Sequence, residues 1–301
     1  MTPASHRLGP VSVYLGPKSG KYPDGNQVVV TGADLVVAFD TPLVAHSLEG
    51  VLDAVDAVIL GHVHEDHLAG LDRLSSVPLW VHEGDLDAAR SWSGMKRHFG
   101  YSDDVLAIWH ERMVRDFFYQ PRPDALGYSN GHTWDLGGGV RVRAHHLPGH
   151  TSGHCALIVE PQGVAFIGDI DLTGFGPYYG DATSNLTQFR RSLRAVRELE
   201  ASAWVTSHHR GVITDRAAFE SALQTFADHL DRRSERLYAM LQGEPQSLDA
   251  LVTQRLVYPV GYEAAFVDDV ERRMILQHLQ ELLDAGRVRR VEASVEMYVR
   301  A

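Results

Sequence analysis

Short apolar runs alternate with longer amphipathic segments over most of this 301-residue chain. The runs are rich in Val, Ile, Leu and Phe and are bounded by Gly, Pro and Asp, a pattern typical of buried strands. The alternation of strands with helical segments predicts a layered α/β fold with candidate polar residues in the loops after strands. We predict strands at 11–15, 27–30, 35–39, 57–60, 78–82, 140–144, 156–159, 164–167 and 203–206.

Amphipathic segments with apolar residues at helical spacing fall between these runs. They predict helices at 83–90, 103–118, 186–199 and 215–241, the last either one long helix or a broken pair. A tight Pro161-Gln162-Gly163 turn separates two of the predicted strands and predicts that they form a hairpin.

The pattern changes at about Gly243, where Gly243-Glu244-Pro245-Gln246 breaks the preceding helix. Ser247 is placed to cap a helix at 248–256, a second helix is predicted at 264–284, and strands follow at 288–291 and 295–299. Two helices and a hairpin predict a winged-helix-like domain at 243–301, attached to a larger α/β domain at 1–242. From Glu244 onward the chain has ten acidic and seven basic residues, which favours packing or dimerisation over DNA binding.

Composition and charge limit the classes of partner. The formal net charge of −11 argues against general attraction to nucleic acid or an anionic membrane. No apolar run is long enough to span a bilayer, and the first residues lack the apolar core of a signal peptide. The single cysteine, Cys155, allows no internal disulfide, which suits a reducing cytoplasm. We therefore expect a cytoplasmic protein with no nucleic-acid or membrane partner. The oligomeric state is left open, a homodimer included.

The densest group of candidate ligands is His62-Val63-His64-Glu65-Asp66-His67. It follows the predicted strand at 57–60 and precedes a segment that reads as the start of a helix. Rigid elements on both sides of such a loop can hold side chains around one point. Three imidazoles and a carboxylate suit zinc and also iron or manganese. The alternative is a solvated His-rich loop.

Three later segments place similar residues after strands. Pro148-Gly149-His150-Thr151 contains a turn that directs His150 away from the chain, Gly168-Asp169 follows the predicted hairpin, and Ser207-His208-His209 follows the strand at 203–206. Each of them alone is typical of a cap or a turn. Together with the first motif they predict a shared metal site.

The chain contains four motifs in this order: H-x-H-x-D-H, P-G-H-T, G-D and a strand-end His. With these motifs it resembles the metallo-β-lactamase superfamily over residues 25–240. The likeness is to hydrolases of its glyoxalase II-like and lactamase-like branches, the latter with a C-terminal winged-helix extension. The resemblance implies an αββα sandwich, two sheets between outer helices, with a dinuclear metal site at one edge and zinc as the expected metal. The ligand set that it implies is His62, His64 and His150 for one ion, Asp66, His67 and His208 for the other, and Asp169 for both.

Five neighbouring residues are candidates for supporting the ligands or contacting substrate. Asp40 ends a strand where the family often has an Asp that orients a ligand, and His154 resembles a histidine of the glyoxalase II branch that is not a ligand. Tyr178 and Tyr179 lie in an aromatic loop at 174–181 and could polarise a substrate or only pack at the surface. His209 is the alternative to His208, which we prefer by aligning Thr206-Ser207-His208 with the P-G-H of the family.

The resemblance implies hydrolysis by a hydroxide that bridges the two ions, with Asp66 positioning it and moving a proton to the leaving group. Asp169 stands where classical zinc β-lactamases have Cys, and His64 stands where flavodiiron oxidoreductases have an acidic residue. We therefore predict a metal-dependent hydrolase of a small ester, thioester or lactone. The alternatives are an endoribonuclease or phosphodiesterase of the same superfamily, and a redox metal protein without hydrolytic activity.

Overall fold

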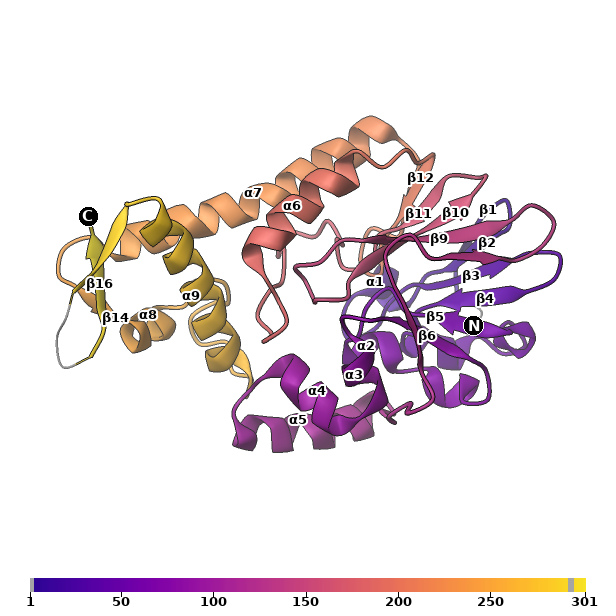
Figure 1. Cartoon of the computed structure of the whole chain (residues 1–301), viewed down its shortest axis with the longest axis horizontal. Helices are drawn as coiled ribbons and strands as arrows, with labels where there is room; N and C mark the ends of the chain where they lie inside the picture. The colour runs from indigo at the N-terminus through magenta and orange to yellow at the C-terminus, as the bar shows by residue number, and fades with distance from the viewer. Residues whose placement is uncertain (1–2, 292–294) are drawn as a thin grey trace.

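Two β-sheets packed face to face form the body of the molecule in the computed structural model, which describes residues 3–291 and 295–301. The first sheet has seven strands in the order β1 to β7, and the second has six in the order β13-β12-β11-β10-β9-β8. Figure 1 shows them together at one end of an elongated molecule. The strands of the first sheet are β1 Ser5–Leu8, β2 Val11–Tyr14, β3 Gln27–Thr31, β4 Val36–Phe39, β5 Ala57–Ile59, β6 Leu79–His82 and β7 Leu126–Tyr128. Those of the second sheet are β8 Thr133–Asp135, β9 Arg141–His146, β10 Cys155–Glu160, β11 Val164–Phe166, β12 Ala203–Val205 and β13 Val212–Ile213.

Helices cover the outer face of each sheet. The chain before β9 contributes α1 Pro17–Gly20, α2 Glu65–Leu68, α3 Leu86–Arg90, α4 Trp92–Phe99 and α5 Asp103–Asp116. The later part contributes α6 Leu186–Arg197 and α7 Arg216–Met240. The segment at 215–241 is one continuous helix, and Asp215 caps it by accepting a hydrogen bond from the Ala218 amide at 2.7 Å.

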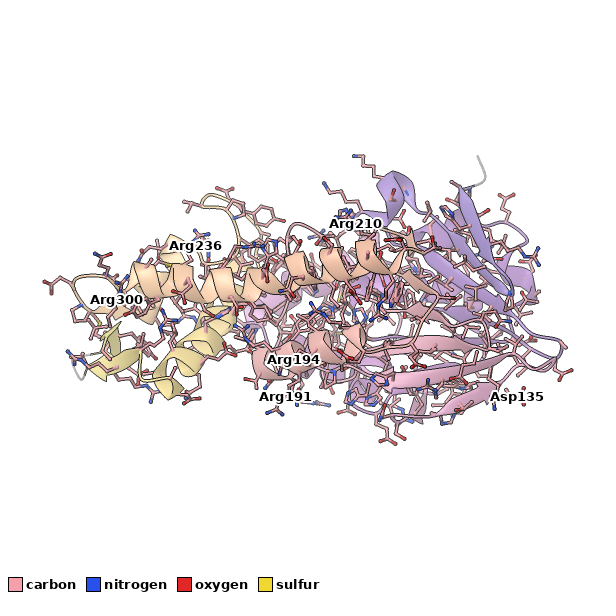
Figure 2. All side chains as sticks on the ribbon, turned by 90° about the horizontal axis from the view of Figure 1, so that it is seen from above. Asp135, Arg191, Arg194, Arg210, Arg236 and Arg300 are labelled. Carbon is pink, nitrogen blue, oxygen red and sulfur yellow. The ribbon has the colours of Figure 1, made fainter. Side chains whose placement is uncertain are left out.

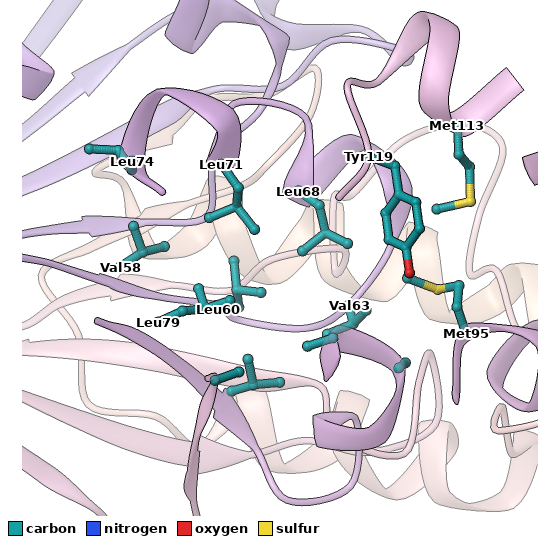
Figure 3. Close-up of a cluster of buried hydrophobic side chains, with 14 of the residues drawn as sticks. Val58, Leu60, Val63, Leu68, Leu71, Leu74, Leu79, Met95, Met113 and Tyr119 are labelled. Atoms are coloured by element: carbon teal, nitrogen blue, oxygen red, sulfur yellow. The ribbon is translucent and has the colours of Figure 1, made fainter. Parts of the chain in front are cut away.

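Three apolar layers hold the sandwich together. The layer between the sheets includes Phe39 of the first sheet and Phe166 of the second, whose ring centroids are 5.8 Å apart. A second layer packs the first sheet against its helices; Figure 3 shows its residues, among them Val58, Leu79 and Met113. A third packs the second sheet against α6 and α7. This helix, sheet, sheet, helix order confirms the predicted αββα fold.

Strand direction places several loops at one edge of the sandwich. In the first sheet β4 and β5 are parallel, and in the second β11 and β12 are parallel. The carboxyl ends of parallel neighbours lie at the same edge. The residues that follow β4 and β5 are thereby brought close to each other, as are those that follow β11 and β12. The predicted hairpin of β10 and β11 is confirmed.

The pattern missed the strands β1, β7, β8, β13 and β14 (Gln246–Ser247) and the helices α1 and α4. β1, β7 and β8 are largely exposed, so they carry little apolar signal. α4 contains a glycine and three basic residues in eight positions. The helix predicted at 83–90 begins only at Leu86, because the preceding Asp85 side chain accepts bonds from other loops.

The C-terminal segment folds as predicted into two helices and a small sheet, with α8 Leu248–Gln254, α9 Val267–Asp284 and strands β14 Gln246–Ser247, β15 Val288–Val291 and β16 Met297–Arg300 in the order β14-β16-β15. Its apolar core contains Leu237 and Leu241 from the end of α7 together with Ile275 and Leu279 of α9. α9 also adds Val270 and Met274 to the core of the sandwich. The division into domains at 242/243 remains a prediction, since α7 and α9 each take part in both cores.

Among the described residues, no helix is both long and apolar enough to cross a membrane.

His278 of α9 links the C-terminal segment to the sandwich and should make folding stability depend on pH. It is fully buried, its Nε2 lies 2.7 Å from the Tyr179 hydroxyl, and its Nδ1 lies 2.8 Å from the Ser234 hydroxyl. Burial, aided by the charges of Arg190 and Arg233, lowers the pKa of His278 to about 3. The unfolded chain, with a His pKa of about 6.5, therefore takes up a proton first as the pH falls. Stability from the neutral ring is complete above about pH 6.5 and is lost below it, by about 2 kcal/mol at pH 5.

We expect the unfolding free energy of the His278→Gln variant to fall about 2 kcal/mol less between pH 7 and pH 5 than that of the unchanged protein. Urea denaturation at both pH values measures this, with His6→Gln as the exposed control. Equal pH dependence in the two variants would contradict the assignment.

Candidate metal centre

All seven predicted ligands meet at the edge of the sandwich where β5, β11 and β12 end. The loop from β5 to α2 supplies His62 and His64, and α2 itself supplies Asp66 and His67. The loop between β9 and β10 supplies His150, and the turns after β11 and β12 supply Asp169 and His208. Asp169 is partly exposed and the other six are buried.

The first group consists of three imidazole nitrogens close to one point. His62 Nε2, His64 Nδ1 and His150 Nε2 lie 3.0–3.1 Å from one another. His64 Nε2 lies 2.7 Å from Asp181 Oδ2, and His150 Nδ1 lies 2.9 Å from the Tyr178 carbonyl oxygen. Since these outer nitrogens face acceptors, they carry the protons, and the inner nitrogens carry lone pairs.

Lone pairs that face one another repel unless a cation lies between them. Burial lowers the pKa of His150 to about 4, so its ring is neutral. A tetrahedral zinc ion with Zn–N distances of about 2.0–2.1 Å would hold its ligand nitrogens about 3.3–3.4 Å apart, close to the spacing of the three imidazoles. The first group therefore fits one metal ion.

The second group combines Asp66, His67 and His208. His208 Nε2 lies 3.2 Å from Asp66 Oδ2, and His67 Nε2 lies 3.7 Å from Asp66 Oδ1. The outer nitrogens again face acceptors: His67 Nδ1 lies 2.7 Å from Asp40 Oδ2, and His208 Nδ1 lies 2.9 Å from the Gly20 carbonyl oxygen. The inner nitrogens of this group are therefore also free to bind a cation.

Asp169 faces both groups. Its Oδ2 lies 3.4 Å from His150 Nε2, and its Oδ1 lies 3.1 Å from His67 Nε2 and 3.4 Å from His208 Nε2. Although burial lowers the pKa of His67, the carboxylates of Asp169, Asp66 and Asp40 outweigh it and raise that pKa well above its usual value. A negative field of this strength favours a bound cation, whether a proton or a metal.

Buried polar atoms without a hydrogen-bond partner are further evidence for a bound metal ion. Among the described residues, His67 Nε2 and Asp169 Oδ1 are buried atoms without a hydrogen-bond partner, although they lie 3.1 Å apart between the two groups. Buried polar atoms are rarely left without one, and such atoms in a native structure often mark a bound ion. The two His/Asp groups fit a dinuclear site of nitrogen and oxygen donors, which zinc, iron or manganese could occupy.

Comparison with known proteins agrees with the fold and the motifs. Residues 42–208, more than half of the chain, match the family model described as the metallo-beta-lactamase superfamily. The chain belongs to the metallo-β-lactamase superfamily.

Curated relatives within the superfamily are distant. An atrochrysone carboxyl ACP thioesterase of Pseudocercospora fijiensis is 24% identical over 64% of this chain and 54% of its own length. A protein of the same name from Aspergillus fumigatus is 28% identical over 50% of this chain and 33% of its own length. The lactamase-like protein aptB of Emericella nidulans is 22% identical over 68% of this chain and 67% of its own. The chain therefore spans about half or less of the two thioesterases.

Solved structures of the superfamily resemble this chain over its full length. A metallo-beta-lactamase family protein of Thermus thermophilus has a TM-score of 0.67 at 23% identity, covering 100% of this chain and 97% of that one. A beta-lactamase domain protein of Burkholderia ambifaria has a TM-score of 0.74 at 19% identity, covering 100% and 96%. At these identities the likeness shows the fold alone.

Two predicted supporting residues lie directly behind ligands. Asp40, besides contacting His67, accepts a hydrogen bond from the Gly61 amide at 2.7 Å. His154 Nε2 accepts one from the Asp169 amide at 3.2 Å. Gly168 has a φ of +55°, and a Cβ there would lie 2.7 Å from His154 Nε2, so both the turn and the close approach require glycine.

The structure separates the remaining candidates. His209 lines the cavity beside the centre but belongs to neither donor group, whereas His208 belongs to the second. Tyr178 also lines the cavity. Tyr179 is corrected as a substrate contact: it is fully buried away from the cavity, with its hydroxyl bonded to His278 and Arg233.

Two aspartates were missed by the sequence interpretation. Asp85 accepts hydrogen bonds from the Val63 amide, the Thr151 hydroxyl and the Gly153 amide at 3.1, 2.6 and 2.7 Å, which ties the first motif to the P-G-H-T loop. Asp181, which orients His64, ends the aromatic loop at 174–181. Asp85 carries no signal beyond a turn before a helix, and the position of Asp181 in a singled-out loop is the only hint of its role.

Asp40 and Asp181 should set metal affinity by holding His67 and His64 in their ligand tautomers. We expect Asp40→Asn and Asp181→Asn each to weaken binding of one zinc ion by about 10- to 100-fold and leave the other ion bound. Competition with a chromophoric chelator measures both affinities, with the exposed Asp34→Asn as control. Affinities equal to those of the control would refute the orienting role.

Proposed function

We propose that this protein is a dinuclear-metal-dependent hydrolase of a small ester, thioester or lactone. The observation that carries the proposal is the pair of donor groups joined by Asp169 at the end of a cavity of about 280 Å³. This volume lies near the lower end of the range for small-molecule sites, about 300–1,000 Å³. The names of the two thioesterase relatives support an acyl substrate.

The chain's own residues would divide the work as follows. His62, His64 and His150 would hold one ion, Asp66, His67 and His208 the other, and Asp169 both. Two divalent ions, when bound, would lower the pKa of a water molecule and polarise the substrate carbonyl.

Asp66 is the candidate for proton transfer. Its carboxylate belongs to the second donor group and also lines the cavity, so it lies between the site and any substrate. We propose that Asp66 orients the attacking water, takes its proton and passes that proton to the leaving oxygen or sulfur.

The charge of the cavity favours an acyl substrate over RNA. Among the described residues, none of those that line the cavity is Lys or Arg, although a phosphodiester substrate would need cations to hold its phosphates. Arg191 and Arg194 of α6 and Arg236 of α7 are exposed on the outer helices instead (Figure 2). We propose a small-molecule partner, no nucleic acid or membrane, action in the cytoplasm, and a homodimer as an arrangement to be measured.

A side-by-side assay of the zinc-loaded protein tests the function. The substrates are a thioester, a lactone, an aryl ester and single-stranded RNA. We expect turnover of at least one acyl substrate, and a loss of at least about 100-fold in kcat in Asp66→Ala and His150→Ala, because each change removes a metal ligand and Asp66→Ala also removes the proton-transfer group. RNA should remain intact.

Asp34→Ala, an exposed carboxylate change, serves as control and should keep full activity. If the unchanged protein cleaves RNA and both ligand variants lose this activity, the protein is a nuclease and not an acyl hydrolase. Visible absorption from iron in the purified protein, without hydrolysis, would favour the redox protein. Turnover that survives both ligand changes would show that the site is wrongly placed.

A further inference from the structure

The cavity beside the metal centre is lined largely by aromatic rings. Nine of its 19 lining residues are Phe, Tyr or Trp. They come from four parts of the chain that are distant in sequence, including the segment between α8 and α9. They are Tyr22, Phe99, Tyr101, Trp109, Phe175, Tyr178, Tyr258, Tyr262 and Phe266.

The rings form a continuous wall that begins at a predicted metal ligand. Phe99 stacks on His64 with ring centroids 6.1 Å apart and planes 3° apart. Tyr101 stacks on Phe99 at 5.1 Å, and Phe266 stacks on Tyr101 at 6.2 Å, each with an interplanar angle of 21°. The inner half of the wall therefore places apolar aromatic side chains along the cavity close to the reacting centre.

The outer half of the wall continues to the surface through the segment between α8 and α9. Tyr258 lies 6.1 Å from Phe266 and 5.5 Å from Phe175 between ring centroids, and it stacks on Tyr262 at 5.3 Å. Tyr262 and Phe175 are 47% and 42% exposed. Large apolar side chains left open at a cavity mouth are available to a ligand.

Positive charge near the wall is turned away from the cavity. Arg233 donates to the Phe175 and Pro177 carbonyl oxygens, and Arg273 donates to those of Gly100 and Gly180. These bonds fix the backbone behind the wall. Glu65 and Asp171 add carboxyl groups to the lining, and none of the described lining residues is a Lys or Arg that would offset them.

We propose that this aromatic wall selects substrates whose acyl part is a bulky, apolar, ring-containing group without negative charge. The inference rests on the proposed hydrolase function and names its substrate class. Flat rings stack on Phe and Tyr side chains, while a carboxylate or phosphate on the acyl part would be desolvated beside acidic groups, with no Lys or Arg among the described lining residues to pair with it. Tyr258, Tyr262 and Phe266 make the C-terminal segment a determinant of specificity.

The reaction needs no further reagent. The oxygen of water bonds to the acyl carbon, the bond from that carbon to sulfur or oxygen breaks, and one proton of the water passes to the leaving group. The other proton of the water leaves the new carboxylic acid for solvent, and the charge of the acyl part is unchanged until then.

Thioesters of N-acetylcysteamine test the inference, since they share one small leaving group. The acyl groups are acetyl, 2-naphthoyl and 6-carboxy-2-naphthoyl, and thiol release by the zinc-loaded full chain is followed. We expect kcat/KM for the naphthoyl thioester to exceed that for the acetyl and the carboxynaphthoyl thioesters by at least about tenfold each.

Variants at the cavity mouth locate the effect. Tyr262→Ala should raise KM for the naphthoyl thioester about fivefold, with kcat and the acetyl kcat/KM within about twofold of the unchanged protein. Val260→Ala, on the same segment but 75% exposed and outside the cavity lining, is the matched control.

Binding separates failure of the inference from failure of the function. The affinity of 2-naphthamide for the zinc-loaded protein, by calorimetry, should fall about fivefold in Tyr262→Ala and stay unchanged in Val260→Ala. Binding of this kind without hydrolysis of any thioester would support the wall and overturn the hydrolase. Equal turnover of acetyl and naphthoyl thioesters, or KM and amide affinity unchanged in Tyr262→Ala, would overturn the inference and leave the hydrolase standing.

Discussion

One constraint dominates this structure: nitrogen and oxygen atoms with free lone pairs lie close to one another in a buried part of the protein. Two groups of imidazole and carboxylate atoms each crowd one point, and Asp169 lies between them. Leaving a buried polar group unpaired costs about 1–3 kcal/mol, and several such groups together repel. A pair of cations would convert this repulsion into attraction, so the same crowding of donor atoms favours metal binding. Asp40, Asp181 and two backbone carbonyl groups face the outer nitrogens of four imidazoles, so each inner nitrogen keeps its lone pair.

The C-terminal segment takes part in the site as well as in its own core. Arg273, Gln277 and His278 of α9 form hydrogen bonds with the loop at 174–181, which also carries Tyr178 and Asp181. The segment between α8 and α9 adds three rings to the cavity. α9, which lies between the small sheet and the sandwich (Figure 1), is thus bonded to the loop whose Asp181 lies 2.7 Å from His64.

The pattern of apolar positions was enough to predict a layered α/β fold, and the resemblance of the motifs to the metallo-β-lactamase superfamily implied the αββα sandwich and the donor types of the site. Apolar runs marked most of the buried strands. The candidate metal ligands are His and Asp residues that can be recognised directly in the motifs H-x-H-x-D-H, P-G-H-T, G-D and the strand-end histidine. The roles of the individual ligands remain predictions, although the structure brings all seven together. Strands β1, β7 and β8 escaped because exposed strands need little apolar character.

The folded arrangement was needed to show which residues support the ligands and which face the substrate. Asp85 and Asp181 act through contacts with residues far away in the sequence, and Tyr178 and Tyr179 are neighbours that point to different surroundings. The aromatic wall joins Phe99 to Tyr258 through Tyr101 and Phe266, which come from separate parts of the chain. A local sequence pattern shows the type of a residue and the helix or strand that contains it. Whether that residue supports a ligand or faces the substrate depends on which side chains, distant in the sequence, it contacts in the fold.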